Sequence, residues 1–158
     1  MCIRDRINVS GGNFVLGAVN IDSTTVLDLD GDNNSLSYGS FNDGTTGGNL
    51  TISIDGSFNL NNSTNIGSGN LTINVDIDND GAETLTVGIS PRAALTIYNG
   101  SAASNDSLTG PNSENIWAIT AGNTGTLAGN GFTNFANLTG GTRAVSYTHL
   151  TLPTILLV

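Results

Sequence analysis

Two segments of the chain repeat almost letter for letter, 21 residues apart: residues 48–55 read GNLTISID and residues 69–76 read GNLTINVD. Apolar and polar residues alternate within each copy, as in a strand that buries one face. A period of about 20 to 25 residues is typical of one coil of a parallel β-solenoid, in which each coil stacks on its neighbour. The repeat therefore predicts an all-β chain folded as a parallel β-solenoid, a right-handed β-helix.

Several short runs with the same alternation are separated by Gly, Asn and Asp turns. The expected strands are residues 25–29, 50–54, 71–77, 85–89, 95–98 and 116–119. Leu71, Leu85 and Leu95 each open an LT-I/V pattern, and their spacings of 14 and 10 residues indicate successive strands within one coil. The alternative fold is an antiparallel β-sandwich, whose strands also recur at short intervals.

Composition restricts the partners of such a chain. Gly, Asn, Ser and Thr supply 21, 22, 15 and 20 of the 158 residues, and the net charge is −9 with no lysine. Nucleic acid and anionic membranes both attract clustered Lys and Arg, so neither is expected as a partner.

The two ends of the chain look foreign to the rest. The DNA string ATGTGTATAAGAGACAG accounts for the opening MCIRDR, and its reverse complement, read in frame, gives VSYTH, which is residues 145–149. The string also resembles the transposase-end adapter of sequencing libraries. We therefore expect residues 1–6 and about 144–158 to derive from an adapter, and residues 7–143 to be a fragment of a repetitive β-solenoid region. The apolar run at the end is too short to span a membrane.

Residues 7–143 contain no Cys, Met, His or Lys. A Ser-His-Asp triad, a thiol nucleophile, a zinc-thiolate site and a catalytic lysine are thus excluded from this segment. Its basic residues are Arg92 and Arg143, too few to pair a catalytic base with an oxyanion partner. We therefore expect no enzyme, no catalytic residue and no organic cofactor; a polysaccharide-active β-helix enzyme fragment is the remote alternative.

The last third of the chain resembles a known repeat. Residues 105–109 read NDSLT, residues 115–120 NIWAIT, residues 122–127 GNTGTL and residues 132–141 FTNFANLTGG. Together, over residues 104–141, they resemble a repeat of large bacterial surface proteins of the filamentous-haemagglutinin and autotransporter adhesin type. The resemblance implies a cell-surface or secreted location. In this block Trp117, Phe132, Phe135 and Leu138 are the large apolar side chains expected to pack into a core.

One motif has the chemistry of a calcium site. Asp76, Asp78 and Asp80 alternate along DIDNDG, and carboxylates that end in a glycine turn can surround a hard cation. An EF-hand would need a bidentate Glu where Val87 stands, so Glu83 is the candidate fourth ligand. The alternative is a solvated turn between strands.

Residues 28–33, which read DLDGDN, are a second aspartate-rich stretch whose carboxylates are less regularly spaced. Its candidate calcium ligands are Asp28, Asp30 and Asp32.

The sequence thus predicts a non-catalytic structural or adhesive repeat segment of a large bacterial cell-surface or secreted protein. Its expected partners are neighbouring repeats of the parent chain and an extracellular glycan or protein, and no membrane span is expected. The alternative function is that of a calcium-stabilised β-sandwich binding module in an adhesin.

Overall fold

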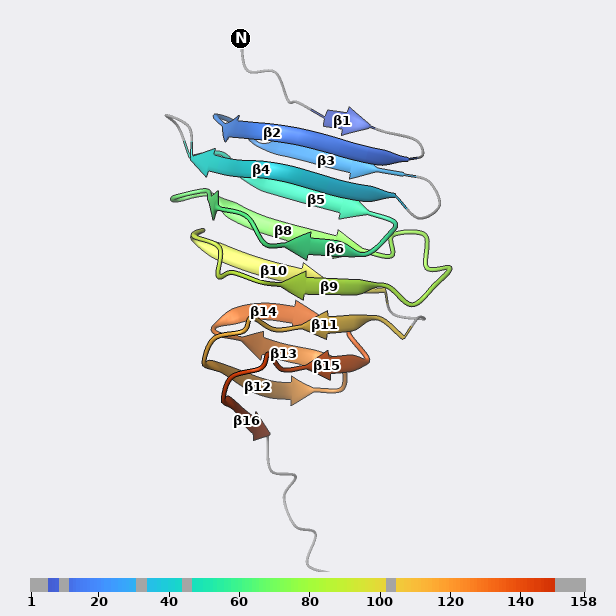
Figure 1. The fold of residues 1–158 in the computed structure, drawn as a ribbon, viewed down its shortest axis with the longest axis vertical. Coiled ribbons are helices and arrows are strands. Elements are labelled where there is room, and N and C mark those ends of the chain that lie inside the picture. The colour runs from blue at the N-terminus through green and yellow to red at the C-terminus, as the bar shows by residue number, and fades with distance from the viewer. Residues whose placement is uncertain (1–5, 9–11, 31–33, 44–46, 102–104, 150–158) are drawn as a thin grey trace, which may run out of the picture.

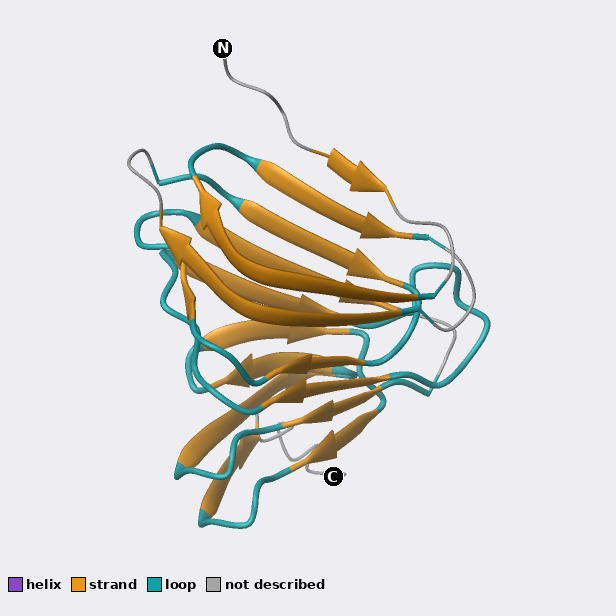
Figure 2. Cartoon of the chain, turned by 45° about the horizontal axis from the view of Figure 1, so that its top comes forward, coloured by secondary structure: helices purple, strands orange, loops and turns teal. Residues whose placement is uncertain are grey.

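The computed structural model describes residues 6–8, 12–30, 34–43, 47–101 and 105–149. All regular elements in these ranges are β-strands joined by turns and loops, without a helix (Figure 2). The described residues therefore contain no helix of the length and apolarity that crossing a membrane requires.

The described strands form three sheets. The largest has nine strands in the spatial order β1 (Arg6–Asn8), β3 (Thr25–Leu29), β5 (Leu50–Ile54), β8 (Asn70–Val75), β10 (Leu95–Asn99), β14 (Asn130–Thr133), β13 (Thr124–Leu127), β12 (Asn115–Ala121) and β16 (Val145–His149). A four-stranded sheet has the order β15 (Asn137–Thr139), β11 (Ser107–Thr109), β9 (Thr84–Val87) and β6 (Phe58–Leu60). A three-stranded sheet has the order β2 (Asn13–Ile21), β4 (Ser35–Asp43) and β7 (Thr64–Asn65).

The chain passes from one sheet to another, and each time it returns to a sheet it adds a strand beside the previous one. In Figure 1, β2 and β4 lie in front of β3 and β5, and the stack runs from β1 near the N-terminus to β16. Strands β3, β5, β8 and β10 pair in parallel in that order, as do β6, β9, β11 and β15. The fold is a parallel β-solenoid, as predicted, and the antiparallel sandwich is excluded.

The repeat spacing is the length of one coil. Leu50 pairs with Leu71 and Ile54 with Val75, so the two copies of the repeat lie side by side in register. The 14-residue step separates β8 and β9, two strands of one coil, as expected. The 10-residue step instead leads from β9 into the next coil, where β10 pairs with β8.

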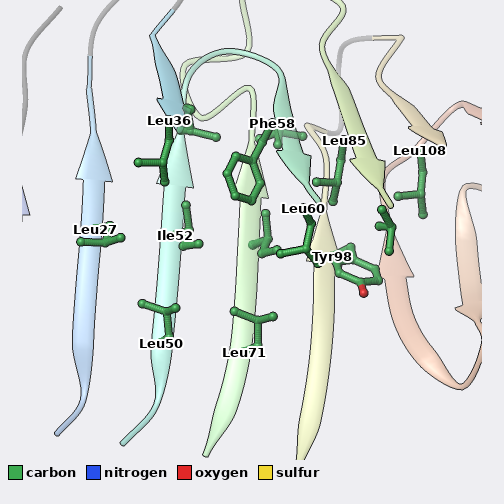
Figure 3. Packing of buried hydrophobic residues seen from close by; sticks show 14 of the residues in the cluster. Leu27, Leu36, Leu50, Ile52, Phe58, Leu60, Leu71, Leu85, Tyr98 and Leu108 are labelled. Carbon is green, nitrogen blue, oxygen red and sulfur yellow. The ribbon is translucent and has the colours of Figure 1, made fainter. Parts of the chain in front are cut away.

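Inward side chains stack in rows between the layers. One row runs from Leu27 through Ile52, Ile73 and Tyr98 to Phe132, each residue paired with the next across the ladder. All five are at most 3% exposed. Figure 3 shows Leu27 level with Ile52, and Leu50 level with Leu71, on neighbouring strands. Burial of each such side chain contributes about 1.5–3 kcal/mol, so these rows are the main source of stability.

Outward side chains form a polar ladder on the same strands. Asn99 Nδ2 donates to Asn74 Oδ1 at 2.8 Å, and Asn74 Nδ2 donates to Ser53 Oγ at 3.0 Å. Parallel pairing in register brings like positions together, which lets one amide both donate and accept along the stack.

The aromatic residues of the last third pack as predicted. Trp117 is fully buried and meets Phe132 edge to face, with 5.7 Å between ring centroids. Phe135 is buried as well, and Leu138 packs against the core.

Several features differ from the predicted strand pattern. The strand expected over residues 71–77 ends at Val75, because Asp76 adopts a φ of 52°, and the strand expected over residues 85–89 ends at Val87. The long strands β2 and β4 were not predicted; their facing Gly17 and Gly39 interrupt the alternation, and a Cβ on Gly39 would lie 3.0 Å from the Gly17 carbonyl carbon. Finally, β12, β13 and β14 form an antiparallel unit inserted into the parallel stack.

The segments expected to derive from an adapter also contribute strands. Arg6 opens β1, which pairs with β3, and residues 145–149 form β16, which pairs in parallel with β12.

Candidate metal centre

The loop after β8 is curled around Asp76. Asp76 and Asn79 both have positive φ, at 52° and 64°, a conformation that Asp and Asn tolerate better than most residues. The Asn79 N–H donates to the Asp76 carbonyl oxygen at 3.3 Å, and the Asp80 N–H donates to Asp76 Oδ1 at 3.1 Å. These bonds fold residues 76–80 back onto the end of β8.

Four aspartates meet at this loop. Asp55, Asp76, Asp78 and Asp80 each offer a carboxylate oxygen, and these oxygens all lie within 4.8 Å of one another. Asp55 directly follows β5 and Asp76 directly follows β8, and the register between the two strands sets these aspartates side by side. We call these four residues the aspartate cluster.

The cluster agrees with the sequence prediction in three residues and differs in the fourth. Asp76, Asp78 and Asp80 come together as expected. Glu83 is held elsewhere, because its Oε2 accepts a hydrogen bond from the Ser57 hydroxyl at 2.7 Å. Asp55 takes the fourth place. The signal for it was present in the sequence, since both copies of the 21-residue repeat end in aspartate.

The cluster has a buried half and an exposed half. Asp55 and Asp76 are each 2% exposed, whereas Asp78 and Asp80 lie at the surface. Both carboxylate oxygens of Asp55, and Oδ2 of Asp76, are buried without a hydrogen bond of ordinary geometry. Unsatisfied buried carboxylate oxygens are costly and therefore uncommon in native structures.

Electrostatics in the cluster disfavour charge on Asp55. Burial raises the pKa of the Asp55 carboxyl to about 7, with further contributions from the carboxyl groups of Asp78 and Asp80. The backbone amide of Asp78 partly opposes this rise in pKa. Without a counter-ion, the folded chain thus favours the protonated form of Asp55.

A nearby aspartate shows how this fold satisfies a buried carboxylate by protein donors alone. Asp106 is fully buried; its Oδ1 accepts the Glu83 N–H at 2.8 Å, and its Oδ2 accepts the Ser101 N–H at 2.6 Å. No local motif marks Asp106 as a structural residue, because its donors lie 23 and 5 residues away. Asp106 therefore ties successive coils together, whereas neither Asp55 oxygen accepts a hydrogen bond of ordinary geometry.

The second predicted site is described only in part. Asp28 lies half-buried on β3 beside Ser53 of β5, and Asp30 follows the strand at the surface. Asp32 lies outside the described residues.

Comparison with known proteins gives no relative for this chain: no family model, curated protein or solved structure matches it. Its function must therefore be argued from the fold and from the site.

Proposed function

We propose that this chain is a non-catalytic structural repeat segment of a larger β-solenoid protein, secreted by or displayed on a bacterial cell. The observation that carries the proposal is the stacking of β3, β5, β8 and β10 in parallel and in register. Each coil contacts its neighbours along the stack, so the architecture extends by adding coils. Such an array is suited to hold binding surfaces at a distance from the cell.

The outward face supports a role in an exposed, wet environment. It carries the Ser53–Asn74–Asn99 ladder, and the whole chain is acidic and without lysine. Hydroxyl and amide groups in regular rows offer hydrogen bonds to an extracellular glycan or protein, which are the ligand classes we propose.

Incomplete burial of apolar side chains in the first described coil supports the proposal that neighbouring repeats are partners. Phe14 and Leu16 of β2 pair with Leu36 and Tyr38 of β4. Leu36 and Tyr38 are buried, at 6% and 5% exposure, whereas Phe14 and Leu16 are only partly buried. A further coil stacked on β2 would complete their burial, and burial of apolar area favours such stacking.

Coil duplication tests the proposal. A second copy of residues 50–70 is inserted after residue 70 of the full chain, with Asp55→Asn in the copy so that no acidic group is added. We expect the longer chain to keep its β signal per residue in far-UV circular dichroism, and to melt at or above the temperature of the parent. The control insertion is the same 21 residues in scrambled order, which we expect to lower the melting temperature.

A duplicated chain that loses its β signal, or that melts as low as the scrambled one, would contradict the repeat-segment proposal. Catalysis is tested separately by incubating the full chain with a panel of acidic and neutral polysaccharides. Release of reducing or unsaturated ends above the buffer level would contradict the non-catalytic role.

A further inference from the structure

The aspartate cluster joins two successive coils. Asp55 belongs to the coil of β5, and the other three belong to the coil of β8 and its loop. Three buried oxygens, both of Asp55 and one of Asp76, accept no hydrogen bond of ordinary geometry within the described chain. Asp106, equally buried, has a backbone donor on each oxygen. Backbone donors therefore serve only part of the cluster: the Asp80 N–H donates to Asp76 Oδ1, and three buried carboxylate oxygens remain without such a bond.

We propose that Asp55, Asp76, Asp78 and Asp80 bind one Ca²⁺ ion that clamps the coil of β5 to the coil of β8. A divalent cation satisfies the buried oxygens and offsets the repulsion among the four carboxylates. This site is independent of the proposed surface role, because it rests on the carboxylate geometry alone.

The ligand chemistry selects calcium among common metal ions. The four side chains offer only oxygen, which hard cations prefer, while Zn²⁺, Cu²⁺ and Ni²⁺ favour sites with imidazole or thiolate. Ca²⁺–O distances of about 2.3–2.6 Å place oxygens on opposite sides of the ion about 5 Å apart. The cluster oxygens lie within 4.8 Å of one another, which fits this span. Mg²⁺ requires a tighter, near-octahedral shell and tends to retain its waters.

The two halves of the cluster have different roles in this site. Asp55 and Asp76 are fixed by the strand ends that they follow, and they form the buried base. Asp78 and Asp80 lie on the exposed loop and give the ion a route from solvent. The loop is itself held to the following coil, since the Ser101 hydroxyl donates to Asn79 Oδ1. The ion therefore binds the stacked state and not the unfolded chain, so it stabilises the stack by mass action.

Calorimetric titration and thermal melting of the full chain test the site. The chain is stripped with EGTA, dialysed, and titrated with CaCl₂ or MgCl₂ near pH 7.5. We expect one Ca²⁺ per chain and a rise in melting temperature of about 5–10 °C at 100-fold excess over Kd. Mg²⁺ should give a smaller rise at the same concentration.

Three variants distinguish aspartates that bind the ion from an aspartate that only stabilises the fold. Asp55→Asn should melt above the wild type in EGTA, because it removes a repelling charge, and it should lose the calcium response. Asp78→Asn, at the surface, should weaken calcium binding by at least tenfold without a risk to folding. Asp106→Asn is the matched buried control: it should lower the melting temperature with and without calcium, and keep the calcium response.

The proposal is overturned if the wild type shows no calcium binding up to millimolar concentrations, the weak end of the range for protein calcium sites. It is also overturned if Asp55→Asn and Asp78→Asn both keep the wild-type response, which would place the ion elsewhere, for example at Asp28 and Asp30. A Mg²⁺ response equal to that of Ca²⁺ would overturn the choice of ion.

Discussion

Replacing Ile73 by Ala tests the stacked-row core directly. Ile73 is fully buried on β8 and lies between Ile52 of β5 and Tyr98 of β10 in the same inward row. Backbone pairing on both sides holds these neighbours in place, so the cavity left by the lost methyl and methylene groups cannot readily close. Ile-to-Ala changes in such settings cost about 2–5 kcal/mol, and we expect about 3 kcal/mol here. For a chain of this size that corresponds to a fall of about 6–12 °C in melting temperature.

The assay is urea unfolding of the full chain, followed by circular dichroism in EGTA. The transition midpoint should fall while its slope with urea stays unchanged, because the surface exposed on unfolding is the same. Thr72→Ala is the matched control, since Thr72 is the adjacent residue and points outward on the same strand. It should cost less than about 1 kcal/mol. A larger loss for Thr72→Ala than for Ile73→Ala would refute the register, because a slip of one residue exchanges the buried and exposed faces.

Three further changes probe other parts of the fold. Asn74→Ala removes two side-chain hydrogen bonds of the outward ladder, and should lower the free energy of unfolding by about 1–2 kcal/mol in the same urea assay. Gly69→Ala should cost about 1–3 kcal/mol, because its Cβ would press on the Gly48 carbonyl group of the preceding coil, whereas Gly122→Ala, with open space around it, should be nearly neutral. The raised pKa of Asp55 predicts a pH effect in EGTA: its protonated form adds stability that is complete below about pH 4 and lost as the pH rises to about 7. Melting temperatures between pH 5 and pH 8 should therefore fall more steeply for the wild type than for Asp55→Asn, and parallel curves would contradict the shift.

The sequence was informative wherever local pattern and coil period agree. The GNLTI repeat predicted stacked coils, and in the structure Leu50 pairs with Leu71, because identical coils gain most when like side chains stack. The same repeat also contained Asp55, the fourth member of the aspartate cluster, but motif spacing along one loop indicated Glu83. Contacts between coils are close in space and about 21 to 25 residues apart in the chain, so a local motif search does not detect them.

Other features could not be predicted because they depend on partners across the stack. Strands β2 and β4 contain glycines that lower strand propensity, yet Gly17 and Gly39 face each other and allow the close approach of the two backbones. The burial of Asp106 is likewise decided by backbone donors from two other segments. In both cases tertiary contacts override the local preference.

The antiparallel unit of β12, β13 and β14 makes the layers of the solenoid unequal in length. Strand β14 follows β10 in one layer and β15 follows β11 in the other, but β13 and β12 add two further strands to the first layer only. Neighbouring strands are about 4.8 Å apart, so the layer that contains β12 and β13 becomes about 10 Å longer than the other. Two layers of unequal length form a wedge, and any coils stacked beyond it take a new direction. A β-solenoid that repeats this antiparallel unit would therefore change direction at each copy and would not be straight.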